Sequence, residues 1–314
     1  MAWMLHSLPD AREIAEYRPP TSSRVFAYDG TLIGEFAKER RILVDYENIP
    51  PVLIRAFLAA EDRTFFQHGG IDYVGISRAM LNNVGNVIRG RRVEGGSTIT
   101  QQVAKNVLLT SDVTIGRKVK EAILAKRLEE TLDKEQILEL YMNEVYLGYE
   151  AYGVGAAAYN YFGKRLQQLT PAEAAYIAAL LKAPSNYHPI RRKPQAMARR
   201  NWILGEMAEL GWLPRDQAQA AMREDLVVQN RPPRTQFASA DYFVEAVRKR
   251  AVASKWGDEV NEGGYYIRTT LNPKLQAAAQ IALMNGLEAY DRRHGWRGAL
   301  GNAGSLEGWE EQAS

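Results

Sequence analysis

The sequence predicts a mainly α-helical protein, with a small hairpin near its N-terminus and a short α+β unit toward its C-terminus. Apolar residues recur with helical spacing through most of residues 51–222, and helix-start signals containing threonine and proline recur along the same stretch. Short extended runs bounded by turn residues lie near the two ends instead. A chain of 314 residues, 46% of them hydrophobic and 25% charged, can bury a sizeable core in one large domain with an appendage or in two domains.

The charge balance argues against a general nucleic-acid binder. The 40 Lys+Arg residues are offset by 37 Asp+Glu residues, so the formal net charge is only +3. An anionic ligand must therefore be met by a local cluster of cations. Cysteine is absent, which excludes disulfides and thiolate chemistry and fits an oxidising compartment as well as the cytosol.

The first elements along the chain are a polar leader and a hairpin. No run of eighteen or more apolar residues occurs, and the N-terminus lacks the layout of a signal peptide, so we expect residues 1–22 to be a leader that follows a missing membrane anchor. Residues 25–44 contain two short extended runs around Asp29-Gly30, a turn dipeptide that predicts a hairpin.

Helices dominate after the hairpin. Proline at the first turn starts a helix at Pro51, and capping-box spacing starts helices at Thr98 and Thr170. Periodicity and Gly, Pro and Asn punctuation predict further helices across residues 117–132, 134–143, 172–181, 194–210 and 214–222.

The C-terminal part reads as a separate unit. Prolines and charges break the helical pattern around residues 230–235, and beyond them we expect a helix near 240–253, an extended run at 264–271 and a helix at 272–287. The last residues have no period and predict an irregular tail. The predicted division is a leader at 1–22, a main domain at 23–230, a linker unit at 231–290 and a tail at 291–314.

Glu61 is the first candidate for chemistry. It continues the apolar stripe formed by Ile54, Phe57 and Leu58, so its carboxyl should lie against apolar surface. Desolvation there raises a carboxyl pKa and prepares the group for proton transfer, which predicts a general base. The alternative is a helix-end acid that only caps or pairs.

A glycine-rich helix start is the second candidate. Free backbone N–H groups and the positive end of the helix dipole gather at residues 95–101 and can hold an anion such as a phosphate. Gln102, Lys105 and Asn106 share a polar face of this helix. The alternative is a well-capped amphipathic helix, and Walker A spacing is missing.

A cation pair followed by an acid is the third candidate. Arg117 and Lys118 precede Glu121 by four and three residues, so all three can face one site. Cations at a helix N-terminus oppose the macrodipole, which indicates that another group needs them there. The alternative is a solvated Arg–Glu pair.

An apolar stripe followed by arginines lies between the first two candidates. Apolar residues at helical spacing run from Ile76 to Ile88 and are followed by Arg89, Arg91 and Arg92. For an enzyme with a lipid-tailed substrate this pattern fits shallow insertion at an anionic membrane, whereas without that context an internal core face is the favoured explanation.

Several ordered motifs resemble those of the peptidoglycan glycosyltransferase domain of class A, bifunctional penicillin-binding proteins. The resemblance covers roughly residues 23–189, with one mild departure at Met142, where leucine is common. The motifs are Glu61-Asp62-x-x-Phe65-x-x-His68-x-Gly70, Gly96-Ser97-Thr98-x-Thr100-Gln101-Gln102, Arg117-Lys118-x-x-Glu121, Ile137-Leu138-Glu139-x-Tyr141-x-Asn143 and Lys182-Ala183-Pro184-Ser185-x-Tyr187-x-Pro189.

The resemblance implies a lysozyme-like, mostly helical fold and polymerisation of lipid II, the undecaprenyl-pyrophosphate disaccharide-pentapeptide, into β-1,4-linked glycan with inversion and release of undecaprenyl pyrophosphate. It implies that Glu61 is the catalytic base and that Glu121 acts at the donor, where it orders cations or a divalent metal such as Mg²⁺ or Mn²⁺. Tyr141 and Asn143 are expected to support the cleft. The remaining implied contacts with substrate are Asp62, Phe65, His68, Ser97, Thr98, Gln101, Gln102, Lys105, Asn106, Arg117 and Lys118.

The resemblance also implies a setting and partners. The setting is the outer, periplasmic face of a bacterial cytoplasmic membrane. The partners are lipid II and the growing glycan chain, phosphoglycolipid inhibitors of the moenomycin type and wall-synthesis proteins. No organic cofactor is implied. The residues after 230 resemble the linker toward a transpeptidase domain, but no Ser-x-x-Lys or Lys-Thr-Gly motif occurs, so we expect no transpeptidase activity.

Two rival functions stay open from the sequence. A lysozyme-like glycan-cleaving enzyme would also place a glutamate in an apolar cleft, but it has little need of Lys105, Arg117 and Lys118 together. The second rival is a catalytically silent module that binds glycan or a partner protein. The acidic and basic residues of the motifs are all present, which argues against this rival.

Overall fold

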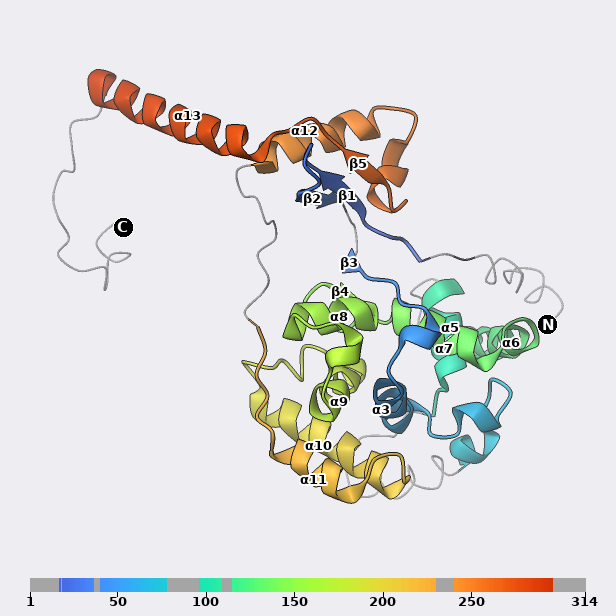
Figure 1. Ribbon diagram of the computed structural model, residues 1–314. Helices are drawn as coiled ribbons and strands as arrows, with labels where there is room; N and C mark the ends of the chain where they lie inside the picture. Colours follow the sequence, from blue (N-terminus) through green and yellow to red (C-terminus); the bar gives the residue numbers. More distant parts are fainter. Residues whose placement is uncertain are drawn as a thin grey trace. The chain divides into compact units, whose positions relative to one another are not determined.

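The computed structural model describes residues 17, 19–36, 40–77, 96–108, 115–229 and 240–295 (Figure 1). The chain forms two compact units. The first comprises Met1–Ser23, Phe36–Arg234 and Asp258–Tyr265, and the second comprises Arg24–Glu35, Thr235–Gly257 and Tyr266–Ser314. The predicted leader to residue 16, the stripe from residue 78 to 92, the boundary around residues 230–235 and the tail from residue 296 lie outside the described residues.

The first unit is mainly helical, as predicted. Its short strands β3 (Arg40–Arg41) and β4 (Ala151–Tyr152) pair in parallel. Its α-helices are α3 (Pro51–Glu61), α5 (Ile99–Leu108), α6 (Ile115–Thr131), α7 (Lys134–Glu144), α8 (Gly153–Phe162), α9 (Pro171–Ala179), α10 (Lys193–Glu209) and α11 (Arg215–Arg223). Single 3₁₀ turns occur at η1 (Tyr46–Asn48), η2 (Phe65–Gln67), η3 (Leu166–Gln168) and η4 (Leu180–Lys182).

The two predicted capping boxes are present. Thr98 Oγ1 accepts from the Gln101 backbone N–H at 3.2 Å, and Gln101 Oε1 accepts from the Thr98 N–H at 3.0 Å. Thr170 and Glu173 form the same reciprocal pair at the start of α9. Each box satisfies N–H groups that a helix start otherwise leaves without a partner, which explains why α5 and α9 begin where they do.

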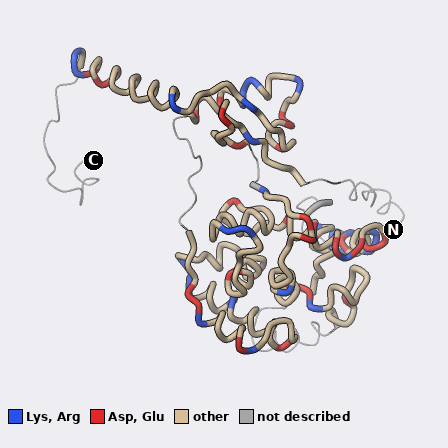
Figure 2. The backbone as a smooth tube through the Cα atoms, viewed as in Figure 1, with Lys and Arg blue, Asp and Glu red and all other residues tan. Residues whose placement is uncertain are grey.

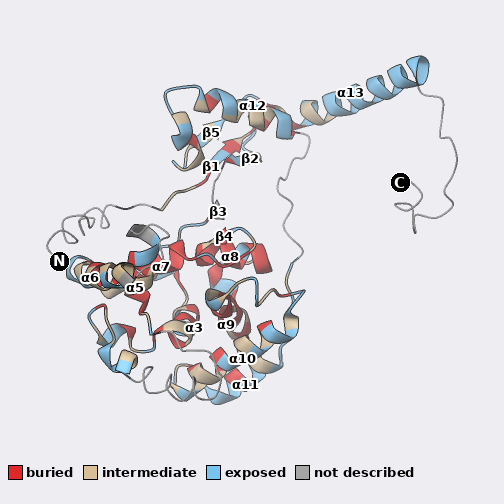
Figure 3. Ribbon diagram, turned by 180° about the vertical axis from the view of Figure 1, so that it is seen from behind, coloured by how far each residue is buried: buried red, intermediate tan, exposed pale blue. Residues whose placement is uncertain are grey.

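The core of this unit surrounds α3. This helix packs against α9 and α10, and its Phe57 ring meets the Tyr141 ring of α7 edge to face, with 6.3 Å between the centroids. Figure 3 shows α3, α7 and α9 as largely buried. Full burial of a side chain such as Phe57 contributes about 1.5–3 kcal/mol, so α3 is anchored on several sides and its C-terminal end is held in place.

The second unit contains a three-stranded sheet in the order β2-β1-β5, formed by β1 (Ser23–Phe26), β2 (Leu32–Phe36) and β5 (Tyr266–Arg268). The predicted hairpin is present, because the Ala27 N–H donates to the Thr31 carbonyl across the turn and Gly30 has a φ of 86°. The contacts group residues 24–35 with the C-terminal unit and not with the main domain to which the sequence assigned them. The reason is the parallel pairing of β1 with β5, a partner more than two hundred residues away.

The helices of the second unit are α12 (Asp241–Val252) and α13 (Pro273–His294), with the 3₁₀ segment η6 (Gly257–Asn261) between them. The prediction that the chain is irregular from residue 291 is wrong for residues 291–294, which continue α13. Arg292 pairs with Glu288 one turn earlier, and cations at a helix C-terminus complement the dipole. Among the described residues, no helix combines the length and apolar character needed to cross a membrane.

Candidate active site

Glu61 occupies the last position of α3. Its side chain is half-buried, and the amide Nε2 of Gln102 donates to its Oε2 at 2.8 Å. Burial raises the pKa of the Glu61 carboxyl, while the Gln102 donor and the positive charges of Arg199 and Lys182 oppose that rise. The desolvated carboxyl that the apolar stripe predicts is therefore found.

Gln102 is fixed from its other end by Tyr141. The Tyr141 hydroxyl donates to Gln102 Oε1 at 3.1 Å, so the amide must direct its NH₂ group toward Glu61. Tyr141 is fully buried, and burial raises the pKa of its hydroxyl well above the ordinary value, which keeps it a donor. Sequence reasoning expected only support from Tyr141. The structure shows that the support acts on the partner of Glu61.

Asp62, Phe65 and His68 hold the segment after α3. Asp62 is buried and accepts hydrogen bonds from the Ile99 backbone N–H at 3.0 Å and from His68 Nε2 at 3.1 Å. Phe65 is fully buried and meets the His68 ring edge to face. These contacts fasten the N-terminus of α5 to the end of α3. Asp62 and Phe65 therefore serve the shape of the site.

The residues before and at the start of α5 divide into two groups. Thr98 and Gln101 form the cap, and Thr98 Oγ1 also donates to the Gly70 carbonyl at 2.6 Å, so both are engaged with the protein. Ser97 Oγ instead accepts from Lys118 Nζ of α6 at 3.0 Å. Lys105 and Asn106 lie exposed on the later turns of the same helix.

Glu121 is the centre of a buried acid–base cluster. Its side chain is 1% exposed, Lys118 Nζ lies 2.6 Å from Oε2, and Arg117 Nε lies 3.0 Å from Oε1. Figure 2 shows charges of both signs along α6. The alternative of a solvated pair is wrong for Glu121, because only Lys118, at 55%, is substantially exposed. A buried carboxylate needs this pairing.

Helix α5 joins the two carboxylates into one arrangement. Its Gln102 contacts Glu61 of α3, and Ser97 just before it contacts Lys118, which in turn holds Glu121 of α6. The helix packs against α6 and α7, which carries Tyr141. Three sequence segments that lie up to sixty residues apart are thus brought together by direct hydrogen bonds. The contacts of the described residues do not tie Lys105 or Asn106 to this arrangement.

The donor set does not fit a resident divalent metal at Glu121. Each of its carboxylate oxygens already faces a cationic nitrogen. Within the described residues, no three His, Cys, Asp or Glu side chains gather as a metal ion would require. A metal held by Glu121 stays a prediction that these contacts do not support.

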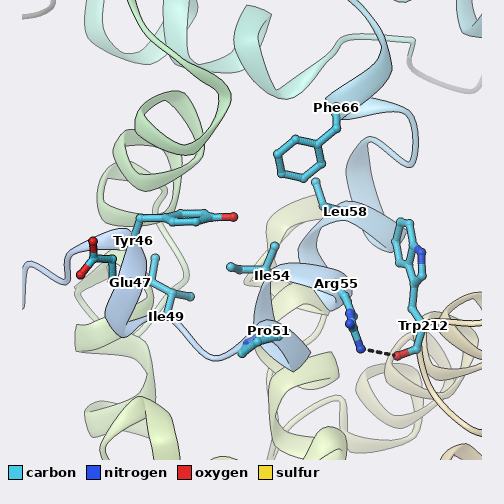
Figure 4. A pocket seen from close by; sticks show the side chains of 9 residues that line it. All are labelled: Tyr46, Glu47, Ile49, Pro51, Ile54, Arg55, Leu58, Phe66 and Trp212. Atoms are coloured by element: carbon cyan, nitrogen blue, oxygen red, sulfur yellow. Dashed lines mark hydrogen bonds between the residues drawn. The ribbon is translucent and has the colours of Figure 1, made fainter.

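A concave feature lies beside α3, where Ile54 and Leu58 of the apolar stripe contribute to its lining. It is a mostly apolar pocket of about 450 Å³ that does not include Glu61 (Figure 4). Arg55 lies at its edge and donates to the Trp212 carbonyl at 3.0 Å. The pocket is lined by Tyr46, Glu47, Ile49, Pro51, Ile54, Arg55, Leu58, Phe66 and Trp212.

Sequence reasoning missed Arg199 and gave no role to Lys182. Both place positive charge close enough to Glu61 to lower its pKa. Lys182 belongs to the fifth motif, which was a usable signal. Arg199 is one of two adjacent arginines in a predicted helix, and helical periodicity does not reveal which other helix it faces.

Comparison with known proteins shows which family the chain is similar to. The family model described as Transglycosylase matches residues 29–208. The chain is 44% identical to Penicillin-binding protein 1A of Rickettsia felis over 97% of its own length, and 43% identical to Penicillin-binding protein 1A of Escherichia coli over 93%. It covers 38% and 34% of those relatives, so it spans well under half of their length.

A solved structure leads to the same family. The crystal structure of Penicillin-Binding Protein 1A from Haemophilus influenzae superimposes with a TM-score of 0.54 at 31% identity, over 92% of this chain and 33% of that chain. Most of the matched range, residues 36–208, lies in the helical unit that carries Glu61 and Glu121. This chain belongs to the transglycosylase family and has homologues named Penicillin-binding protein 1A.

Proposed function

We propose that this chain polymerises lipid II into β-1,4-linked glycan strands at the outer face of a bacterial cytoplasmic membrane. The observation that carries the proposal is the connection, through α5, of a desolvated carboxylate at Glu61 with the cation cluster around Glu121. Glycosyl transfer from a diphosphate needs a base for the incoming hydroxyl and positive charge for the departing group, and the two ends of this arrangement offer them.

In the proposed reaction, Glu61 takes the proton of the sugar 4-hydroxyl of the acceptor. The oxygen attacks the anomeric carbon of the lipid-linked donor from the side opposite the diphosphate. The bond from that carbon to the diphosphate oxygen breaks, and undecaprenyl pyrophosphate leaves with the electron pair. The raised pKa of Glu61 makes it a stronger base than an exposed carboxylate, and Gln102 orients it.

The cations would act on the leaving group. Arg117, Lys118 and Glu121 together carry one net positive charge, and the Nζ of Lys118, whose side chain is 55% exposed, is held by Ser97 as well as by Glu121. We propose that Glu121 keeps the two cations oriented and that Lys105 adds a further positive charge. A leaving group that is already anionic is stabilised by such fixed charges and needs no proton.

The rival closest to this proposal is glycan cleavage by a lysozyme-like enzyme. A glutamate with a raised pKa suits a general acid as well as a base. However, glycan hydrolysis releases a neutral sugar hydroxyl, so it gives no role to the buried cluster around Glu121. From the same substrate class we propose three kinds of partner, namely the membrane surface, wall-synthesis proteins and inhibitors of the moenomycin type.

The test is incubation of the purified chain with labelled lipid II in detergent. Polymer of increasing length supports the proposal, whereas release of free disaccharide supports cleavage, and an unchanged substrate supports a silent binding module. Glu61→Gln is the matched variant, because it keeps shape and a hydrogen-bonding partner for Gln102 and removes the base. Polymer formed at the normal rate by that variant would refute the role of Glu61.

A further inference from the structure

Arg199 of α10 acts electrostatically on Glu61, whose pKa it lowers, and has no role in the reaction proposed above. Its guanidinium stacks on the indole of Trp202, with 4.0 Å between the guanidinium carbon and the ring centroid. The guanidinium carbon of Arg63, two residues after Glu61, lies 5.9 Å from the same centroid. Arg63 also forms an ion pair with Glu206 of α10. This Arg63–Trp202–Arg199 cluster fastens the end of α3 to α10.

The two arginines of the cluster differ in their partners. Glu206 offsets the charge of Arg63, whereas no hydrogen bond or ion pair reaches Arg199 from the part of the chain that the structure describes. The Nε of Arg199 is buried, and burial lowers the pKa of its guanidinium against the opposing influence of Tyr187, Glu61 and Glu206. Leaving the buried Nε without a hydrogen-bond acceptor is costly, so this placement requires an explanation.

The stack on Trp202 leaves the N–H edges of the Arg199 guanidinium as its available donors. A planar guanidinium fixed in this way matches the two oxygens of a carboxylate or phosphate. Arg117 and Lys118 are already engaged with Glu121, whereas the positive charges of Arg199 and the exposed Lys182 lower the pKa of Glu61. The site therefore has two sets of cations, one of which acts electrostatically on the base.

We propose that Arg199, held by Trp202, binds an anionic group of the acceptor substrate and so places the acceptor hydroxyl at Glu61. The inference rests on the proposed function, because it assumes that Glu61 is the base. The anionic group is an oxyanion, and in a lipid-linked disaccharide-pentapeptide it belongs either to the diphosphate or to a carboxylate of the peptide.

The acidity of Glu61 provides a second readout. The groups that influence it are Arg199, Lys182 and Gln102, which lower its pKa, and Asp62, which raises it. Loss of the Arg199 charge should therefore raise the pKa of Glu61 further. The acid limb of the pH–rate profile would move to higher pH, a change that a purely structural contact would not cause.

The experiment measures equilibrium binding of lipid II in detergent to the Glu61→Gln variant, which cannot consume it. We expect added Arg199→Gln to weaken binding about tenfold or more, and Arg199→Lys to recover part of the loss, since a charged hydrogen bond is restored without the fork. Arg215→Gln, which removes an exposed arginine of α11, is the matched control and should change nothing. Thermal unfolding of each variant verifies that it is folded.

The outcomes separate the sources of the anion and the two proposals. With lipid-linked disaccharide that lacks the peptide, persistence of the Arg199 effect identifies the diphosphate, and its loss identifies a peptide carboxylate. Equal binding by the Arg199→Gln and Arg215→Gln variants would overturn the inference, as would an unshifted pH profile of Arg199→Gln in the wild-type background. Polymerisation that does not depend on Arg199 overturns only this inference. Arg199-dependent binding together with no turnover by the wild-type chain overturns the proposed function and leaves Arg199 only as a binding residue for the anionic group. Failure of every variant to bind would overturn both.

Discussion

Tyr141→Phe tests whether the alignment of Glu61 depends on the Tyr141 hydroxyl, which reaches Glu61 through Gln102. The substitution deletes the oxygen that donates to Gln102 Oε1 at 3.1 Å and keeps the ring that packs against Phe57. Gln102 then loses the bond that fixes its orientation. Its NH₂ group is no longer held toward Glu61 Oε2, from which it lies 2.8 Å away in the intact protein.

The expected size of the effect follows from the burial of Tyr141. Its side chain is fully buried, so water cannot replace the lost hydroxyl, and an unsatisfied Gln102 oxygen adds to the loss of a hydrogen bond. We expect a destabilisation of about 1–3 kcal/mol. In a domain of 150–250 residues each kcal/mol lowers Tm by about 2–4 °C.

The catalytic effect has a definite sign. The Gln102 donor lowers the pKa of Glu61, so its displacement lets the pKa rise further above the ordinary value. A base acts only when deprotonated, so the rate on the acidic side should fall earlier as pH decreases and should recover at higher pH. The assay is kcat/KM for labelled lipid II against pH, together with thermal unfolding followed by circular dichroism.

Tyr176→Phe is the matched control for this prediction. Tyr176 is also fully buried, and its hydroxyl donates to the Tyr187 carbonyl at 3.1 Å, but that bond does not reach Gln102. We expect a comparable loss of stability and an unchanged pH profile. Superimposable pH profiles of the two variants would show that the Tyr141 hydroxyl has no influence on Glu61 and would refute the reasoning.

Three further predictions concern the charged residues. Glu61→Gln should lower the polymerisation rate by about 10²–10⁴-fold, as loss of a general base does. Because the pKa of Glu61 is raised in the folded state, its carboxyl destabilises the fold increasingly as pH rises from its unfolded pKa through its folded pKa. Unfolding measured at several pH values should therefore show the free energy of unfolding of Glu61→Gln increasing relative to that of the wild type over this window. Above the folded pKa the difference should become constant. Glu121→Gln should lower the free energy of unfolding by about 1–3 kcal/mol, which is less than the loss on breaking a fully buried ion pair, because water can reach Lys118. A denaturant titration that finds no loss of stability would contradict the pairing. Lys105→Ala and Arg117→Ala should each reduce turnover strongly without preventing folding, and unchanged turnover in steady-state assays would remove that residue from the proposed site.

The sequence by itself determined the features that depend on neighbours along the chain. Both expected capping boxes formed, because Thr98 and Thr170 act on residues three positions away. The spacing of Arg117 and Lys118 to Glu121 likewise placed all three groups on one side of a helix, since helical geometry alone brings such positions together. The apolar stripe of α3 correctly predicted a desolvated carboxyl at Glu61.

Only the tertiary structure decided which groups these residues meet. Gln102 reaches Glu61 across 41 residues and Tyr141 across 39, and β1 pairs with a strand near the other end of the chain. Periodicity tells which face of a helix is buried, but it does not tell which helix covers that face or which side chain stands opposite. For that reason Arg199, which lies on α10 and acts on the end of α3, became visible as part of the site only when the helices were packed together.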